Sequence, residues 1–135
     1  MNTATARYAG HLRTEATHAA SGNVIQTDAP TDNHGRGEAF SPTDLVSTAL
    51  GSCMMTVMGI VAERHQLDLV DSTFAVVKHM SSEAPRRIAQ IDVTFTMPAA
   101  LSPSDRSLLE RTALTCPVTL SLHPDIKQNV VFEYR

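Results

Sequence analysis

The sequence predicts a single domain, residues 1–135, of the α+β class with the element order βββ-α-ββ-αα-β. One long stretch, residues 45–62, carries no charged side chain and predicts a buried helix. Residues 89–97 alternate between apolar and polar side chains, which is typical of a strand with one buried face. Strands and helices follow in runs rather than in strict alternation, and this favours the α+β class over a parallel α/β fold.

Composition narrows the possible functions. The 135 residues carry a formal net charge of −3 and show no run of Lys and Arg, which argues against a nucleic-acid binder. Residues 1–10 contain no apolar signal segment, and the chain has only two cysteines. We therefore expect a cytoplasmic protein in which the cysteines stay reduced.

The N-terminal third predicts three strands and a long loop. Residues 5–12 and 14–20 are rich in small and β-branched side chains, and a Ser-Gly-Asn turn leads into a short strand at 24–27. Residues 28–40 form a polar, glycine-rich loop. Loops of this length in compact domains are often functional.

A helix is predicted in the stretch from Ser41 to His65, which ends in a polar turn at 63–65. Ser41 can cap its first free N–H group, Pro42 suits the first helical position, and Asp44 suits the positive helix end. A helix this apolar is either buried or spans a membrane. We favour burial because several polar side chains interrupt it, and because its small residues suit close packing, also against a symmetry mate. These residues are Ser47, Thr48, Gly51, Ser52, Thr56 and Gly59.

The remaining chain predicts two strands, two helices and a final strand. Ser102, Pro103 and Asp105 repeat the helix-start pattern seen at Ser41. The predicted elements are a strand at 69–80, a turn at 81–86, a strand at 89–97, a helix at 103–114, a break at 115–117, a short helix at 118–122 and a strand at 129–134.

The two cysteines occupy different predicted settings. Cys116 precedes Pro117 at a helix start, where backbone N–H groups stabilise a thiolate. Cys53 lies mid-helix in apolar company, so its thiolate is disfavoured unless a cation reaches it. Both residues could also be plain core side chains. The six histidines show no metal-ligand spacing, and we expect no metal.

Six motifs together resemble the OsmC/Ohr family, in its general OsmC-like branch. The likeness covers nearly the whole chain, because the order of elements agrees as well. The motifs are Leu-Arg-Thr-Glu-Ala-Thr-His at 12–18, Asp-Asn-His-Gly at 32–35, Ser-Pro-Thr-Asp-Leu at 41–45, Leu-Gly-Ser-Cys at 50–53, Thr-Cys-Pro-Val at 115–118 and Ser-Leu-His-Pro at 121–124.

The resemblance implies an intertwined homodimer with antiparallel sheets around two long central helices and active sites at the subunit interface. It also implies a thiol peroxidase for organic hydroperoxides. Cys53 would attack the peroxide and become a sulfenic acid. Cys116 would resolve it as a disulfide, which a dithiol reductant reopens. The resemblance implies neither a metal nor an organic cofactor.

The family also places an arginine beside the first cysteine and a glutamate that holds this arginine. Arg36 on the glycine-flanked loop is the best match, and Arg13 is the second candidate. Thr43 stands where the family has its glutamate, although Glu38 and Asp44 lie nearby. This departure keeps two alternatives open. One is a weakly catalytic or non-catalytic protein that binds an apolar small molecule at the dimer interface, and the other is a structural dimer with inert cysteines.

Overall fold

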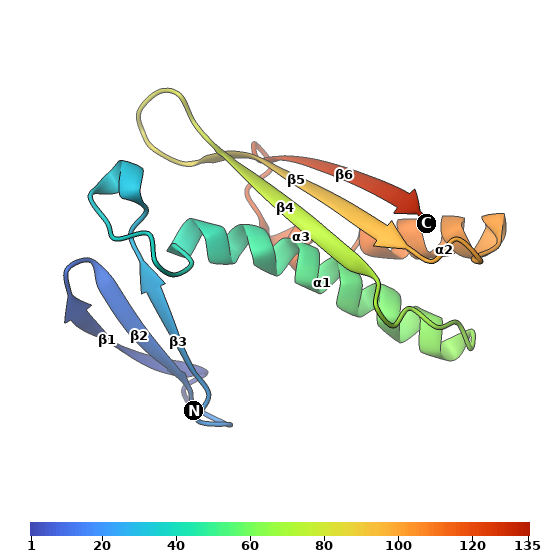
Figure 1. Ribbon diagram of the computed structural model, residues 1–135, viewed down its shortest axis with the longest axis horizontal. Helices are drawn as coiled ribbons and strands as arrows, with labels where there is room; N and C mark the ends of the chain where they lie inside the picture. The colour runs from blue at the N-terminus through green and yellow to red at the C-terminus, as the bar shows by residue number, and fades with distance from the viewer. The chain divides into compact units, whose positions relative to one another are not determined.

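The computed structural model describes residues 1–135, and it confirms the α+β class and the order of elements (Figure 1). The contacts divide the chain into two compact units, residues 1–46 and residues 47–135. The first unit holds three strands, a 3-10 turn and the start of the long helix; the second holds the rest. That the chain behaves as one domain stays a prediction.

The first unit contains an antiparallel sheet with the strand order β1-β2-β3. Its strands are β1 (Ala4–Gly10), β2 (Arg13–His18) and β3 (Val24–Asp28). The predicted first strand was too long, because His11 and Leu12 adopt positive φ angles of 53° and 62° and form the turn into β2. The second was also too long, because the chain turns after His18, whose carbonyl accepts the Gly22 N–H at 2.8 Å.

The β1-β2-β3 sheet carries little apolar core of its own. Six of the seven residues of β1 are exposed, and so are the first three of β3. Tyr8, Val24 and Ile25 are large apolar side chains that remain about half exposed or more, at 64%, 53% and 48%. A small sheet without a covered apolar face has little independent stability.

The long helix α1 (Pro42–Arg64) begins where the sequence predicts. The Ser41 hydroxyl accepts the Asp44 N–H at 3.0 Å, and the Asp44 carboxylate accepts the Ser41 N–H at 2.9 Å. This reciprocal pair is a capping box with Asp in the place of the usual Glu. By length and composition alone α1 could cross a membrane, with a mean hydropathy of 1.8, but the core helix of a soluble protein passes the same test.

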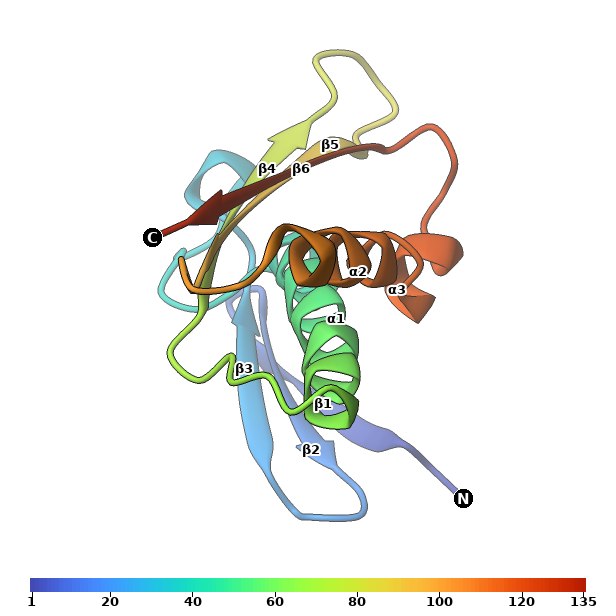
Figure 2. The same ribbon diagram turned by 90° about the vertical axis from the view of Figure 1, so that its right-hand side faces the viewer.

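The second unit is a three-stranded sheet with helices on one face, as Figure 2 shows. Strand β4 pairs antiparallel with β5, whereas β5 and β6 run parallel. The sheet is thus mixed rather than wholly antiparallel, since two helices separate β5 from β6 and return the chain to the end of the sheet at which β5 starts. The elements are β4 (Thr73–Met80), β5 (Ile88–Met97), α2 (Pro103–Ala113), α3 (Pro117–Ser121) and β6 (Lys127–Tyr134).

The strand predicted from residue 69 begins four residues later, at Thr73. The Asp68 side chain accepts the Val70 N–H at 2.8 Å, which closes a local turn. Asp71 then adopts a positive φ of 69°, a conformation that a strand does not allow. The apolar residues Leu69 and Val70 thus belong to the connection and not to β4.

The core of the second unit lies between α1, α2 and the inner face of the sheet. The alternation predicted for β5 is confirmed: Ile91, Val93 and Phe95 are fully buried, whereas the residues between them are only half-buried. The helices contribute Leu50, Met54, Met58, Ala62, Leu109 and Ala113. Burial of these side chains is the main stabilising term for the unit.

Polar contacts fasten α2 to the end of β6. The Tyr134 hydroxyl donates a hydrogen bond to the Glu110 carboxylate, and the Arg106 guanidinium lies 4.1 Å from the centre of the Tyr134 ring. Burial, together with the Glu110 carboxylate, raises the pKa of Tyr134 well above its usual value. Tyr134 therefore stays protonated at neutral pH and can donate this hydrogen bond.

Helix α1 packs closely against the β4 side chain Phe74 at Gly51. A Cβ atom at this position would lie 2.6 Å from two ring carbons of Phe74, whereas a Cβ at Gly59 would meet nothing within 4 Å. Gly51 is thus required by packing, because any side chain would force Phe74 or the helix to move.

We predict that Gly51→Ala destabilises the protein by about 1–3 kcal/mol, since the clash with Phe74 outweighs the better helix propensity of alanine. Gly59→Ala is the matched control and should be neutral or stabilising by up to about 1 kcal/mol. Denaturant unfolding of the two variants measures the difference. Equal stabilities would contradict the tight contact at Gly51.

Candidate functional site

The two cysteines lie side by side in the second unit. Cys53 projects from α1 and is half-buried, whereas Cys116 is fully buried at the start of α3. Both are free thiols. The Cys53 thiol is within hydrogen-bonding reach of the Cys116 thiol and of the Val118 backbone N–H. Two thiols in such contact can lose two electrons together as a disulfide.

Cys116 is the N-cap of α3, as its place before Pro117 predicts. Its sulfur accepts the Thr119 backbone N–H at 3.3 Å, and its thiol donates to the Thr119 hydroxyl at 3.2 Å. A cysteine is an unusual cap, but the sulfur takes the role that a serine or aspartate oxygen has elsewhere. The first N–H groups of α3 thus point at the two sulfurs.

The surroundings of Cys53 oppose ionisation. Burial raises the pKa of the Cys53 thiol, and the neighbouring Cys116 raises it further, whereas the Val118 N–H lowers it in part. This agrees with the expectation for a mid-helix cysteine in apolar company. Fast nucleophilic chemistry at Cys53 needs a cation in addition to what the second unit supplies.

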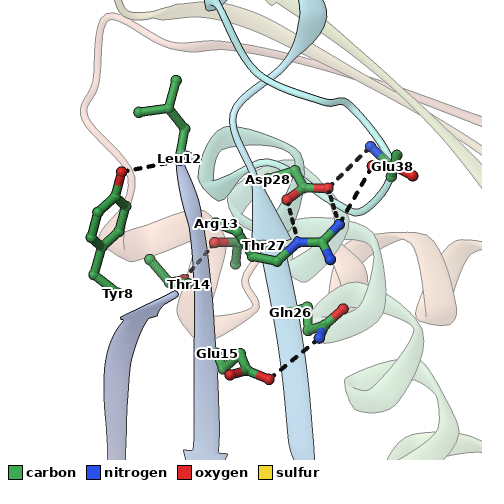
Figure 3. Close-up of polar contacts among 9 residues, drawn as sticks. All are labelled: Tyr8, Leu12, Arg13, Thr14, Glu15, Gln26, Thr27, Asp28 and Glu38. Carbon is green, nitrogen blue, oxygen red and sulfur yellow. Dashed lines mark hydrogen bonds and ion pairs between the residues drawn. The ribbon is translucent and has the colours of Figure 1, made fainter. Parts of the chain in front are cut away.

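In the first unit, the Arg13 side chain is fixed by contacts with two carboxylates, as Figure 3 shows. The Arg13 guanidinium forms a two-pronged contact with the Asp28 carboxylate: Nε lies 2.7 Å from Oδ1, and Nη2 lies 2.8 Å from Oδ2. The Glu38 carboxylate lies 3.8 Å from Nη2, and the Glu38 backbone N–H donates to Asp28 at 3.2 Å. Bidentate contacts of this kind fix the guanidinium plane.

Asp28 is the residue that sequence reasoning missed. It is fully buried, and its hydrogen bond from Arg13 holds the pKa of its carboxyl below the usual value, although burial alone would raise it. The register of the β2-β3 hairpin pairs Arg13 directly with Asp28, one residue beyond the strand predicted at 24–27. Opposite charges at such positions attract.

The other predicted site residues lie nearby in the first unit. Arg36 is exposed on its loop, and its charge contributes to the lowered pKa of Asp28. Its neighbour Gly35 packs so tightly that a Cβ would overlap the Ala29 carbonyl. Glu38, a possible supporting carboxylate, lies against Arg13. Asp44 caps α1.

Thr43, in the place of the family glutamate, shares a 3.2 Å hydrogen bond with the Ser41 hydroxyl. The histidines, cysteines and carboxylates form no group of three or more that could hold a metal ion. The roles predicted for Cys53, Cys116, Arg36, Arg13, Glu38 and Asp44 stay predictions.

The fold and the paired thiols define a small α+β protein with two neighbouring cysteines. The sequence profile described as OsmC-like protein matches residues 35–131. The chain therefore belongs to the OsmC-like family, and the resemblance noted in the sequence is confirmed. No curated protein matches the sequence.

Several solved structures share the fold. A protein from Psychrobacter arcticus 273-4, described as a candidate osmotic stress induced and detoxification response protein, is 46% identical; the match has a TM-score of 0.94 and covers 98% of this chain and 96% of that one. The organic hydroperoxide resistance protein OsmC from Legionella pneumophila has a TM-score of 0.75 at 14% identity, with 98% of each chain covered.

A third structure, a candidate organic hydroperoxide resistance protein from Vibrio cholerae, has captopril bound in one of its active sites. It matches with a TM-score of 0.74 at 15% identity and covers 98% of this chain and 92% of that one. At these identities the Legionella and Vibrio proteins show a common fold only.

We predict that Asp28 contributes stability that is lost in acid. Its pKa is lowered from 3.8 by folding, so the contribution is present above pH 3.8 and disappears as the pH falls through the lower folded value. Asp28→Asn should be less stable at pH 7 and should lose less stability between pH 5 and pH 2. The exposed Asp71→Asn is the control, and denaturant midpoints across this range are the measurement. An Asp28→Asn variant with the wild-type acid profile would refute the prediction.

Proposed function

We propose that this protein is a two-cysteine thiol peroxidase that reduces organic hydroperoxides. The observation that carries the proposal is the direct neighbourhood of the Cys53 and Cys116 thiols. Cys53 is the more accessible of the two, which suits attack on a peroxide, and Cys116 is buried beside it, which suits resolution. Membership of the OsmC-like family supports the same reading.

The proposed cycle has three steps. The Cys53 thiolate attacks the outer peroxide oxygen, the O–O bond breaks, and the alcohol leaves with one proton. Cys116 then attacks the resulting sulfenic acid, so that an S–S bond forms and water leaves. An external dithiol reduces the disulfide by thiol exchange and restores both thiols. The cycle requires no metal and no organic cofactor.

In this proposal an arginine supplies the cation that Cys53 needs. Arg36 is the match by sequence position. The contacts favour Arg13, because Asp28 and Glu38 hold its guanidinium as the family glutamate would hold the arginine elsewhere. In this scheme Asp28 holds the arginine, a role that Thr43 cannot fill because it has no carboxylate. Asp44 serves the start of α1 in this scheme.

We also propose that the protein is a homodimer in a reducing cytoplasm. Two exposed features support a second copy: the nearly uncovered β1-β2-β3 sheet, and one face of α1 with Ala49, Ser52, Thr56 and Ile60. The α1 face is made of small and apolar side chains, which suit helix packing, and two free thiols suit a reducing compartment.

The dimer proposal predicts that Ile60→Arg yields a monomer, because a charge cannot be buried in an apolar helix contact. Val77→Lys is the control, since Val77 is similarly exposed at 53% but lies across from Asp92 on the outer face of the sheet. Sedimentation equilibrium gives the masses. A wild-type monomer, or a dimer that tolerates arginine at residue 60, would contradict the proposal.

A second candidate function is the binding of an apolar small molecule with little or no catalysis. A groove of about 470 Å³ runs along the C-terminal half of α1, between Met55, Gly59 and the connection that carries Leu67, Leu69 and Val70. Its walls are mostly apolar, as ligand sites usually are. Under this alternative the thiols oxidise slowly and without preference for organic peroxides.

The peroxidase proposal predicts fast loss of both thiols after one equivalent of cumene hydroperoxide, and slower loss with hydrogen peroxide. Stopped-flow mixing with thiol counting measures both. Cys53→Ser should abolish the fast reaction, whereas Cys116→Ser should stop it after one thiol, at the sulfenic acid. Slow, unselective oxidation of the wild type would favour the binding protein instead.

The same assay separates the two arginines. Arg13→Gln should slow the first step roughly tenfold to hundredfold if its guanidinium supplies the charge-assisted contact to the reacting sulfur. Arg36→Gln should then have a small effect. The reverse order would assign the role to Arg36, and no effect of either substitution would contradict arginine activation.

A further inference from the structure

The buried thiol of Cys116 has one polar side chain beside it apart from Cys53. This is Thr119, whose hydroxyl lies 3.2 Å from the sulfur and whose backbone N–H lies 3.3 Å from it. Cys116 has no exposed surface, whereas Thr119 is only half-buried. A half-buried residue thus supplies the hydroxyl that contacts a fully buried thiol.

We propose that Thr119 is a catalytic residue of the resolving step, where its hydroxyl donates a hydrogen bond to the Cys116 thiolate and holds it for attack on Cys53. This inference rests on the proposed peroxidase function, because it concerns the step that follows oxidation of Cys53. It adds a residue that the family resemblance and the sequence motifs did not single out.

The Cys116 sulfur forms the S–S bond with the Cys53 sulfur, and the S–O bond of the sulfenic acid breaks. The departing hydroxide takes up one proton, which balances the proton that Cys116 has released, and leaves as water. The two electrons of the new bond come from the Cys116 thiolate, and the oxidising equivalent comes from the hydroperoxide in the preceding step.

A threonine hydroxyl is suited to this work because it can both accept and donate a hydrogen bond. In the resting protein the Thr119 hydroxyl accepts a weak hydrogen bond from the Cys116 S–H group. Once the proton has left, the hydroxyl can turn and donate to the thiolate, a charge-assisted contact roughly twice as strong as a neutral one. The hydroxyl therefore favours the reactive form of Cys116.

Thr119 is itself fixed by a contact outside α3. The Gln128 side-chain amide donates to the Thr119 carbonyl at 3.3 Å, which ties the short helix to β6. The Thr119 hydroxyl that contacts Cys116 therefore belongs to a short helix that is hydrogen-bonded to β6.

The test uses the full-length protein in single-turnover oxidation with cumene hydroperoxide over pH 5–9. Thr119→Val removes the hydroxyl but keeps the shape and the backbone N–H. We expect loss of the second thiol, relative to the first, to slow about tenfold, with its pH profile moved to higher pH. Sulfenic acid trapped by dimedone should accumulate. Thr119→Ser should restore the wild-type rate and profile.

Thr112→Val is the matched control, because Thr112 is also half-buried but its hydroxyl donates to the Leu108 carbonyl. It should leave the ratio of the two rates and the pH profile unchanged. Thermal unfolding of each variant verifies that it is folded, and Thr119→Ala replaces Thr119→Val if the valine disturbs α3. A Thr119→Val protein that resolves at the wild-type rate and pH would overturn the inference.

A second readout separates this inference from the peroxidase proposal. In the Cys53→Ser background, thiolate absorbance at 240 nm should appear at higher pH when Thr119 is replaced by valine, whether or not peroxide reacts. If peroxide oxidises neither thiol of the wild type, the peroxidase proposal fails. If the absorbance titration is the same with threonine and valine, the role of Thr119 fails.

Discussion

The contact between α1 and the inner face of the second sheet is the constraint on which the thiol site depends. Leu50, Met54 and Met58 enter the core beside β5, and Gly51 brings the helix against Phe74. Cys53 adjoins Met54 in the chain, so the packing of that methionine sets the direction in which the thiol points. Because the packed side chains admit few other positions, the helix can neither slide nor rotate freely, and the thiol stays beside Cys116.

Cys116 is positioned beside Cys53 by the start of α3 and not by apolar packing. The chain leaves β5, forms α2 and breaks at Pro117, and the break turns the sulfur and the first N–H groups of α3 toward α1. One cysteine is therefore placed by apolar packing and the other by hydrogen bonds at a helix start. The two settings give the thiols different exposures, and this difference supports different chemical roles for them.

The sequence predicted the elements well where a strong local signal exists. Ser41 with Asp44, and Ser102 with Pro103, marked both helix starts, and the alternation in 89–97 marked β5. The predicted strand ends were wrong at Leu12 and Asp71, where a positive φ ends or delays the strand. A positive φ at a residue other than glycine is hard to recognise in the sequence. The parallel pairing of β6 also escaped it, since that pairing depends on the path through α2 and α3. The partner of Arg13 was missed for a related reason: Asp28 looks like a loop residue until the register of the hairpin is known.

The parallel pairing of β5 with β6 has a consequence for how the thiol site assembles during folding. The β4-β5 hairpin joins neighbouring segments and can form early, whereas β6 must close a long connection before it pairs, at a larger loss of chain entropy. Cys116 lies inside that connection, and Gln128 on β6 helps to hold its helix. The pair of sulfurs is thus completed only when the last strand docks, so a chain that is still folding carries two separate thiols rather than a ready site for oxidation.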